Sequence, residues 1–277
     1  MAALPSLVVN GRGTEMPKRW IPLVALFVFA LFVVPAAAAE RNVHQVVAAK
    51  PDGTVSVEIV SGSVRFVAWD KNEVQIDGTL EEDVEDLDIE SKGSTISIEV
   101  ELVDEDNLHH ADAHLEIRVP RGSSIEAESV AAELGVEGIS GSVSIESVSG
   151  DVEIRGDMVE IEASTVSSDV TVQTSAPVRD AQFESVSGDV TFGGKLDPHG
   201  RFHAESVSGD VELRLGSSAS ADFRVETFSG EIENKLGPPA ERSGPYVPAK
   251  TLSFQLGGGG AKVTIESFSG TVRLLAE

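Results

Sequence analysis

Acidic side chains recur at regular intervals along the second half of the chain, and carboxylates in such a pattern are able to bind metal ions. One series is Glu146, Glu184, Glu205, Glu226 and Glu266, and another is Asp151, Asp169, Asp189 and Asp210, which Glu231 continues. Like charges on neighbouring strands repel each other unless a cation bridges them, and calcium prefers carboxylate and carbonyl oxygens. Asp151, Asp189 and Asp210 are therefore candidate ligands of a divalent cation.

The same carboxylates have a simpler interpretation, which we favour. A carboxylate at a turn stays solvated, and an Asp side chain there accepts hydrogen bonds from backbone N–H groups. Arg155, Arg214 and Lys235 follow members of the two series and would neutralise part of the charge. The glycine- and aspartate-rich nonapeptide of calcium-binding β-rolls is absent from the sequence. We therefore expect no cofactor, and a bound divalent cation is the alternative.

A second candidate metal site is the segment HADAH, which contains His110, Asp112 and His114. Residues two apart on a strand share one face, so an adjacent pair could chelate zinc or copper. The three together span about 13 Å along an ideal strand, which is too far for one ion unless the strand bends. His109 and His110 could equally lie in a polar loop.

The sequence has no arrangement typical of an active site. Serines are abundant, but a catalytic serine would be singular, whereas these recur in a repeated motif: Ser149, Ser187, Ser208, Ser229 and Ser269. Neither a G-x-S-x-G nor an H-E-x-x-H motif is present. The glycines at 257–260 lack the Lys and Ser/Thr that complete a phosphate-binding loop. We therefore expect that the protein is not an enzyme.

Composition restricts the partners. The 277 residues contain 21 Lys and Arg against 46 Asp and Glu, which gives a formal net charge of −25. Such a charge repels nucleic-acid phosphates and anionic lipid headgroups, so we expect no nucleic-acid partner. The absence of Cys excludes disulfides, thiolate metal sites and a cysteine nucleophile. Trp69, Tyr246 and Phe254 could form an aromatic contact for a sugar or a protein, but packing is the simpler interpretation.

Residues 1–39 have the layout of a secretory signal peptide. Lys18 and Arg19 precede an apolar run of 15 residues, WIPLVALFVFALFVV, and small residues follow it. The run is shorter than the roughly 20 residues of a membrane-spanning helix. We predict a mature chain of residues 40–277 that has no membrane span and is exported to a periplasmic, cell-surface or secreted location. Met16 is an alternative start, and an uncleaved signal anchor is the competing interpretation.

The second half of the chain repeats a short motif. The copies are ESVSGDVEI (146–154), STVSSDVTV (164–172), ESVSGDVTF (184–192), ESVSGDVEL (205–213), ETFSGEIEN (226–234) and ESFSGTVRL (266–274). Equivalent positions are 18, 20, 21, 21 and 40 residues apart, so we expect one degenerate unit within the last step. A period near 20 with many Val, Ile, Ser and Thr residues predicts two short strands per unit.

The hydrophobic alternation changes phase inside each motif. Val263 and Ile265 alternate with polar residues, but the next apolar residue is Phe268. We therefore predict that the inward phase changes between the hydroxyl residue and the apolar residue that follows it, which requires a corner. These pairs are Ser147/Val148, Ser185/Val186, Ser206/Val207, Thr227/Phe228 and Ser267/Phe268.

Glycines follow the predicted corners, and we expect them to use positive φ, which glycine adopts most easily. They are Gly150, Gly188, Gly209, Gly230 and Gly270, with Ser168 at the equivalent position of one motif. On this basis, replacing Gly209 by Val is predicted to destabilise the fold far more than replacing Ser218 by Val.

Together these features predict an all-β, single-domain β-solenoid, similar to a parallel β-helix, with coils of about 20 residues over residues 40–277. Successive coils at about 4.8 Å would pair their backbones and stack their aliphatic side chains. Open ends need protection, and the candidates are EEDVEDLDIES (81–91) and the C-terminal RLLAE. The proline-rich GPPAERSGPYVPAK (237–250) predicts an excursion from the stack, to which LGGGGAK returns the chain.

The chain resembles the "putative adhesin" domain family, bacterial β-strand-repeat proteins of unknown function. The resemblance covers nearly all of 43–277 and rests on WDKNEV (69–74), LDIESKGSTISIEVE, LEIRVPRGSSIEAES (115–129), the recurring ESVSGDV and GGGGAKVTIESFSGTVRL. It implies an exported β-solenoid of the cell envelope and brings no catalytic residues with it. Ser168 departs from the family pattern, which has Gly at this corner.

We interpret the sequence as a non-enzymatic, exported module of the cell envelope, structural or adhesin-like, with an envelope protein or polysaccharide as its partner. One alternative is a β-helix enzyme that acts on polysaccharide, and another is an envelope sensor or accessory protein. The oligomeric state stays open.

Overall fold

The computed structural model describes residues 40–103, 111–216, 218–244 and 247–277. The predicted signal peptide, His110 and Tyr246 lie outside the described residues. The chain divides into the units Met1–Ala37 and Ala38–Glu277, and every described residue belongs to the second unit. This unit is an all-β single domain, and no helix of its described part is long and apolar enough to cross a membrane.

The described residues form nineteen strands. In chain order they are β1 (Arg41–Ala48), β2 (Thr54–Trp69), β3 (Glu73–Leu80), β4 (Val84–Lys92), β5 (Thr95–Leu102), β6 (Asp112–Pro120), β7 (Ser124–Glu137), β8 (Ser142–Ser147), β9 (Val152–Gly156), β10 (Glu160–Thr165), β11 (Val170–Ser185), β12 (Val190–Ser206), β13 (Val211–Leu215), β14 (Ala221–Thr227), β15 (Glu231–Asn234), β16 (Glu241–Arg242), β17 (Lys250–Leu256), β18 (Ala261–Ser267) and β19 (Thr271–Ala276).

The strands form two hydrogen-bonded ladders, and the long strands β2, β7, β11 and β12 contribute one part to each. The first ladder runs in the order β4, β5, β2, β7, β8, β10, β11, β12, β18, β14, β17 and β16. The second runs in the order β1, β3, β6, β2, β7, β9, β11, β12, β13, β19 and β15. Pairs between β5 and β14 in the first ladder are parallel, as a β-solenoid-like fold requires.

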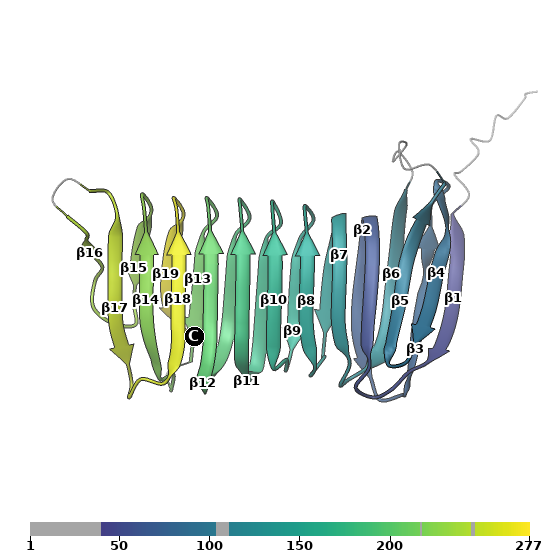
Figure 1. Ribbon diagram of the computed structural model, residues 1–277, viewed down its shortest axis with the longest axis horizontal. Coiled ribbons are helices and arrows are strands. Elements are labelled where there is room, and N and C mark those ends of the chain that lie inside the picture. Colours follow the sequence, from purple (N-terminus) through teal and green to yellow (C-terminus); the bar gives the residue numbers. More distant parts are fainter. Residues whose placement is uncertain (1–39, 104–110, 217, 245–246) are drawn as a thin grey trace, which may run out of the picture. The chain divides into compact units, whose positions relative to one another are not determined.

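One coil consists of a strand in each ladder and the turn between them, and β8–β9 is an example (Figure 1). Val143 and Ile145 of β8 and Ile154 of β9 are buried, with exposed fractions of 1% or less. Alternate residues of both strands therefore point into the space between the ladders, where Val, Ile and Leu from neighbouring coils stack on each other. The two-residue alternation read from the sequence accounts for this core.

The position predicted for the phase change is wrong. Ser147 continues the inward phase of Val143 and Ile145 and is only 5% exposed, whereas Val148 is 48% exposed. The Ser147 hydroxyl is tolerated inside because it donates to the Ser149 carbonyl oxygen at 3.1 Å and lies 3.0 Å from the Ser168 hydroxyl. The phase changes in the turn that follows, and the same holds for the other motifs, which bury Ser185, Ser206, Thr227 and Ser267 and expose the next residue.

The reason for the corner glycines also differs from the prediction. Of the five, Gly150 alone has a positive φ, at 99°. The other four are needed because a Cβ would lie 1.8 to 2.0 Å from a carbonyl oxygen of the adjacent coil. Close approach of one backbone to the next therefore selects glycine here. Ser168, at the equivalent position, is 1% exposed and its hydroxyl contacts that of Ser147.

The order of coils along the stack departs from the order in the sequence. β18 pairs with β12 on one side and β14 on the other, and β19 lies in the same way between β13 and β15. In Figure 1 the yellow β18 lies between the green strands β12 and β14. We call β18–β19 the inserted coil. The chain leaves a gap after β13, forms β14–β17, and returns through the glycine-rich segment to fill the gap.

Antiparallel strands cover both ends of the first ladder. Among the described strands β4 pairs only with β5, so the acidic segment 81–91 lies at one end, as predicted. At the other end β17 runs antiparallel to β14 and carries β16, so the proline-rich segment leaves the parallel stack as predicted, in place of a degenerate repeat unit. The C-terminal RLLAE was expected to cover an end, which is wrong: it belongs to β19, inside the second ladder.

Candidate functional site

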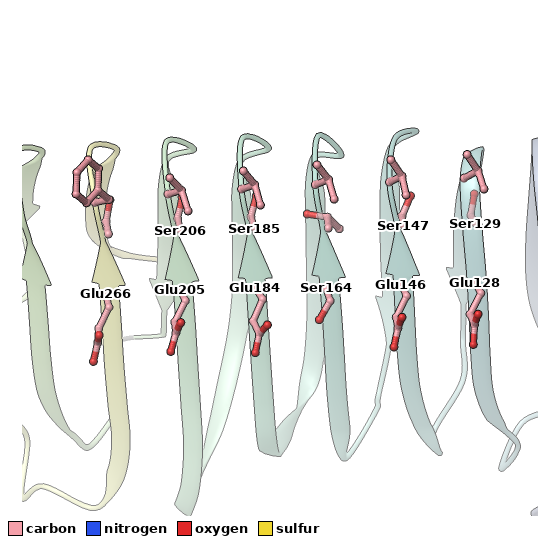
Figure 2. Close-up of a pocket in the computed structure, with 18 of the residues that line it drawn as sticks. Glu128, Ser129, Glu146, Ser147, Ser164, Glu184, Ser185, Glu205, Ser206 and Glu266 are labelled. Carbon is pink, nitrogen blue, oxygen red and sulfur yellow. The ribbon is translucent and has the colours of Figure 1, made fainter.

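A groove of about 1050 Å³ follows the outer surface of the first ladder, close to the turns that lead into the second ladder. From β7 to β14 its lining repeats from strand to strand: a glutamate, a buried hydroxyl residue and an exposed apolar residue, consecutive in sequence, with Ser164 of β10 in place of the glutamate. Figure 2 shows the labelled glutamates in one line, in which Ser164 takes one place, and Ser129, Ser147, Ser185 and Ser206 in a second line. The groove thus has an acidic wall, a floor of backbone and an apolar wall.

The acidic wall, which we call the glutamate row, confirms the register that the motif predicts. Backbone pairing places its members on adjacent strands in the order Glu99, Glu58, Glu128, Glu146, Glu184, Glu205, Glu266 and Glu226. Ser164 of β10 interrupts the row between Glu146 and Glu184. Sequence reasoning missed Glu58, Glu99 and Glu128 because their strands lack the ESVSGDV motif. Apart from Glu146 and Glu184, which are two strands apart, neighbouring members are separated by one strand spacing of about 4.8 Å along the stack.

The other wall, which we call the apolar row, was not predicted. One member projects from β7 and the others from consecutive turns, and together they are Val130, Val148, Val166, Val186, Val207, Phe268 and Phe228. Their exposed fractions run from 44% at Val166 to 55% at Phe268. The rings of Phe228 and Phe268 stack with centroids 5.0 Å apart and planes inclined by 10°. Apolar side chains gathered in an exposed line mark an interaction surface more often than scattered ones do.

Backbone hydrogen bonds hold the apolar row in place. The Val148 N–H donates to the Ser129 carbonyl at 3.1 Å, and the Ser149 N–H donates to the Val130 carbonyl at 2.9 Å. Equivalent bonds continue through the later coils, so the ladder extends past the ends of the strands into the turns. The exposed residues therefore lie on a rigid, regularly spaced edge.

The hydroxyl residues beneath the groove close each turn. The Ser185 hydroxyl donates to the Gly188 carbonyl at 2.6 Å, and that of Ser206 donates to the Gly209 carbonyl at 2.7 Å. The Ser267 hydroxyl accepts the Gly270 N–H at 3.0 Å. These buried oxygens are occupied by structural bonds. The serines that the sequence assigned to the corners lie two residues further along, where the Ser149 hydroxyl donates to the Val130 carbonyl at 3.1 Å and the Ser208 hydroxyl donates to the Val186 carbonyl at 3.0 Å.

The glutamate row is only partly neutralised. Glu226 accepts from the Arg224 guanidinium at 2.8 Å, and Glu205 lies 2.9 Å from the His203 imidazole. No hydrogen bond or ion pair from the described residues reaches the carboxylates of Glu128, Glu146 or Glu266. Carboxylates 4.8 Å apart in water repel by roughly 1 kcal/mol for each pair. The groove therefore carries a concentrated negative charge.

The aspartate series has a structural role. The Asp169 carboxylate accepts the Asp189 N–H at 2.8 Å, and the Asp189 carboxylate accepts the Asp210 N–H at 2.7 Å. Asp210 in turn accepts the Thr271 N–H at 2.7 Å and pairs with Arg273 at 2.9 Å. Each side chain thus adds a bond between adjacent coils. This is the role that the turn interpretation gave to these carboxylates.

The other metal candidates gather in a smaller depression of about 400 Å³ on the second ladder. Asp112, His114 and Asp151 line it together with Glu133, while His110 lies outside the described residues. The Ser61 hydroxyl bonds to Asp112, and the Ser63 hydroxyl lies 2.9 Å from His114 Nδ1. Among the described residues, no three His, Asp or Glu side chains are arranged to hold a metal ion. Asp189 and Asp210 are not part of this depression.

The predicted aromatic contact does not form between its described members. Trp69 lies in β2, where its indole N–H donates to the Glu73 carbonyl at 2.8 Å and the Lys71 ammonium lies 4.4 Å from the ring centroid. Phe254 lies in β17 and stacks on Phe223 at 4.5 Å. Both rings pack locally, as the simpler interpretation held.

Comparisons with known proteins place the fold. The family model Toastrack DUF4097 matches residues 34–275. A "putative cell adhesion protein" from Clostridium sporogenes is 10% identical, with 86% of this chain and 100% of that chain covered and a TM-score of 0.37. A "putative lipid binding protein" from Parabacteroides distasonis is 13% identical, with 85% of this chain and 96% of that chain covered and a TM-score of 0.47. A "putative adhesin" from Bacteroides fragilis is 10% identical, with 85% of this chain and 97% of that chain covered and a TM-score of 0.40. No curated protein matches the chain.

Proposed function

The chain belongs to the Toastrack DUF4097 family, and we propose that it is a non-enzymatic interaction module that holds an elongated partner in the groove between the glutamate row and the apolar row. One observation carries the proposal: the fold buries hydroxyl residues such as Ser147 and exposes the adjacent valines and phenylalanines in an unbroken line. Such an arrangement forgoes the free energy of burying apolar surface, about 25 cal/mol per Å². A partner that covers the line would recover it.

Repetition favours binding over catalysis. A catalytic site needs one nucleophile or acid/base pair that differs from its surroundings, whereas this groove offers the same three residues on successive coils. Repeated weak contacts suit an elongated partner because each further contact is made within the complex already formed. The serine hydroxyls under the groove are already bonded to the turns.

Export to the cell envelope is part of the proposal. It is supported by the charged and apolar segments within residues 1–39, which have the order of a signal peptide. The mature chain would then be residues 40–277, in a periplasmic, cell-surface or secreted location, where its partner is an envelope protein or polysaccharide. Mass spectrometry of the N-terminus after expression in a bacterial host tests the cleavage, and an intact N-terminus would refute it.

The binding role is tested with residues 40–277, which contain both ladders and the core. The measurement is retention of the protein by envelope fractions of the native host, with and without chelator. We expect the triple variant Val148→Ser, Val186→Ser, Val207→Ser to lose at least ten-fold in retention. Val159→Ser is the matched control, because Val159 is 44% exposed but lies outside the groove. Equal retention of the triple variant and the control would refute the groove as the binding site.

Two further outcomes separate the alternatives. Loss of retention in chelator would assign the binding to a divalent cation. Turnover of an envelope polysaccharide that one Asp or Glu substitution abolishes would replace the binding role by an enzymatic one.

A further inference from the structure

We propose that the partner held in the groove is a cationic amphipathic polypeptide helix, with Lys or Arg along one flank and apolar side chains along the next. The inference rests on the proposed function and names the chemistry of the partner. The glutamate row would contact the basic flank, and the apolar row would contact the apolar flank. Because the groove displays carboxylates and apolar side chains in two parallel rows, a complementary ligand has cationic side chains along one line and apolar side chains along the other.

Charge complementarity selects a cation. Glu128, Glu146 and Glu266 have no partner among the described residues, and their side chains are exposed, with the carboxylates turned away from the line of serines (Figure 2). A polyanion such as nucleic acid, an acidic polysaccharide or an anionic lipid surface would meet this row with like charge. A neutral glycan would leave the carboxylates without a counter-charge. A chain of Lys or Arg side chains would pair with them.

The apolar row excludes a simple polycation. Seven exposed Val and Phe side chains flank the carboxylates on consecutive coils, and the stacked Phe228 and Phe268 end the line. A ligand with charge alone would leave this line in water. A ligand with apolar side chains beside its cations would cover it, and the affinity would then depend on the order of the side chains as well as on their charge.

Repeat distances favour a helix over an extended strand. The coils repeat every 4.8 Å or so. On an α-helix a given face recurs once per turn of about 5.4 Å, whereas on an extended strand same-face residues recur about every 6.6 Å. The two rows run together from β7 to β14, which is about 29 Å at the coil spacing. A helix of about 19 residues has this length.

The lateral spacing of the rows agrees with the same ligand. Glu146 and Val148 are two residues apart on an extended backbone, which separates their Cα atoms by about 6.6 Å. A helix with side chains is about 10 Å across. It would therefore lie over both rows at once, with adjacent flanks on the two walls. Ser164, on the third strand of this stretch, gives the acidic wall one neutral position.

The test uses a defined probe, a 19-residue Leu/Lys peptide patterned as an amphipathic helix, and residues 40–277 of the protein. Its control is a peptide of the same composition in scrambled order, which has the same charge without the two flanks. Fluorescence anisotropy gives Kd, and circular dichroism reports helix gained on binding. We expect the patterned peptide to bind at least ten-fold tighter than the scrambled peptide, to gain helix, and to weaken as salt is added.

Two groove variants probe the two walls. Glu146→Gln, Glu184→Gln, Glu205→Gln and Val148→Ser, Val186→Ser, Val207→Ser should each weaken the patterned peptide at least ten-fold. The matched controls are Glu133→Gln with Glu153→Gln on the second ladder, and Val159→Ser, which should change Kd less than two-fold. All these side chains point outward, so melting curves should stay close to that of the parent protein.

The outcomes separate this inference from the function on which it rests. Equal binding of the patterned and scrambled peptides, or an unchanged Kd in the valine variant, would overturn the helix proposal. If the peptide fails to bind while the valine variant loses retention by envelope fractions, the groove remains the binding site and the partner has a different chemistry. If neither measurement responds to the groove variants, both proposals fall.

Discussion

Replacing Gly209 by Ala tests whether close contact between coils, and not φ, fixes the corner glycines. The new Cβ would lie 2.0 Å from the Gly188 carbonyl oxygen and 2.6 Å from its carbon, while an ordinary contact begins at 3.4 Å. Because the obstacle is backbone, the two coils must move apart by about 1.4 Å at this corner. The stack cannot absorb such a shift without breaking bonds on both sides of it.

The bonds at risk give the magnitude. The Ser206 hydroxyl donates to the Gly209 carbonyl at 2.7 Å, and the Asp210 N–H donates to the Asp189 carboxylate at 2.7 Å. Each contributes about 1 kcal/mol net, and overpacking a tight site costs about 1–3 kcal/mol more. We therefore expect Gly209→Ala to lower the free energy of unfolding by about 3–5 kcal/mol, which corresponds to about 10 °C in Tm for a domain of this size.

Gly216→Ala is the matched control. A Cβ at this position has no heavy atom within 4 Å, and the glycine is not in the left-handed region. Ala is then expected to leave stability unchanged within about 1 kcal/mol, or to raise it slightly by restricting the unfolded chain. Both proteins would be unfolded by heat and by urea, with circular dichroism as the signal. Similar melting temperatures for the two variants would refute the close-contact explanation.

Three further predictions follow from the same contacts. Truncation after residue 256 removes the inserted coil, so limited proteolysis should digest β14–β17 as well, and their continued protection would contradict the observed order of coils. Phe202→Ala removes a ring from a buried cluster, in which the neighbouring ring centroids lie 5.3 and 5.5 Å from that of Phe202. It should lower the free energy of unfolding, measured in urea, by about 3–5 kcal/mol, while Phe268→Ala at the exposed groove should lower it by less than about 1 kcal/mol. The hydrogen bond from His44 holds the pKa of the Asp77 carboxyl below its ordinary value. Asp77 therefore stabilises the folded state above the unfolded pKa of about 3.9, and that contribution is lost as pH falls through the lowered pKa. The Tm difference between the parent and Asp77→Asn should shrink between pH 5 and pH 2, and a constant difference would contradict this prediction.

The repeated coils and the glutamate row were predictable because both depend on register alone. Copies of ESVSGDV at a nearly constant interval predict that equivalent residues stack, and the pairing of Glu184 with Glu205 and of Glu205 with Glu266 confirms it. The turn role of the aspartates was predictable for the same reason. The row extends to Glu58, Glu99 and Glu128 through strands without the motif, so the repeat alone did not identify them.

The apolar row was missed because hydrophobicity was taken as evidence of burial. In ESVSGDV hydrophobicity alone predicts that the valine starts the inward phase of the second strand, but burial follows the backbone alternation, and this places the serine inside. A buried hydroxyl costs little when it has a partner, and the turn supplies one for Ser185 and Ser206. The sequence did contain the information, because Val143, Ile145 and Ser147 are alternate residues of one strand and so point to the same side.

The inserted coil was beyond sequence reasoning because nearly identical repeats fit against one another in more than one order. A local clue exists in hindsight: the two motifs with Phe in place of Val, at Phe228 and Phe268, are neighbours in the stack and their rings pack together. β14 reaches the rest of the first ladder only through β18, so its coil gains its inner partner when the residues after the glycine-rich segment fold into the gap. The aromatic end of the groove is assembled in the same step. The part of the groove beyond β12, which includes its aromatic end, therefore exists only in a stack that contains the inserted coil.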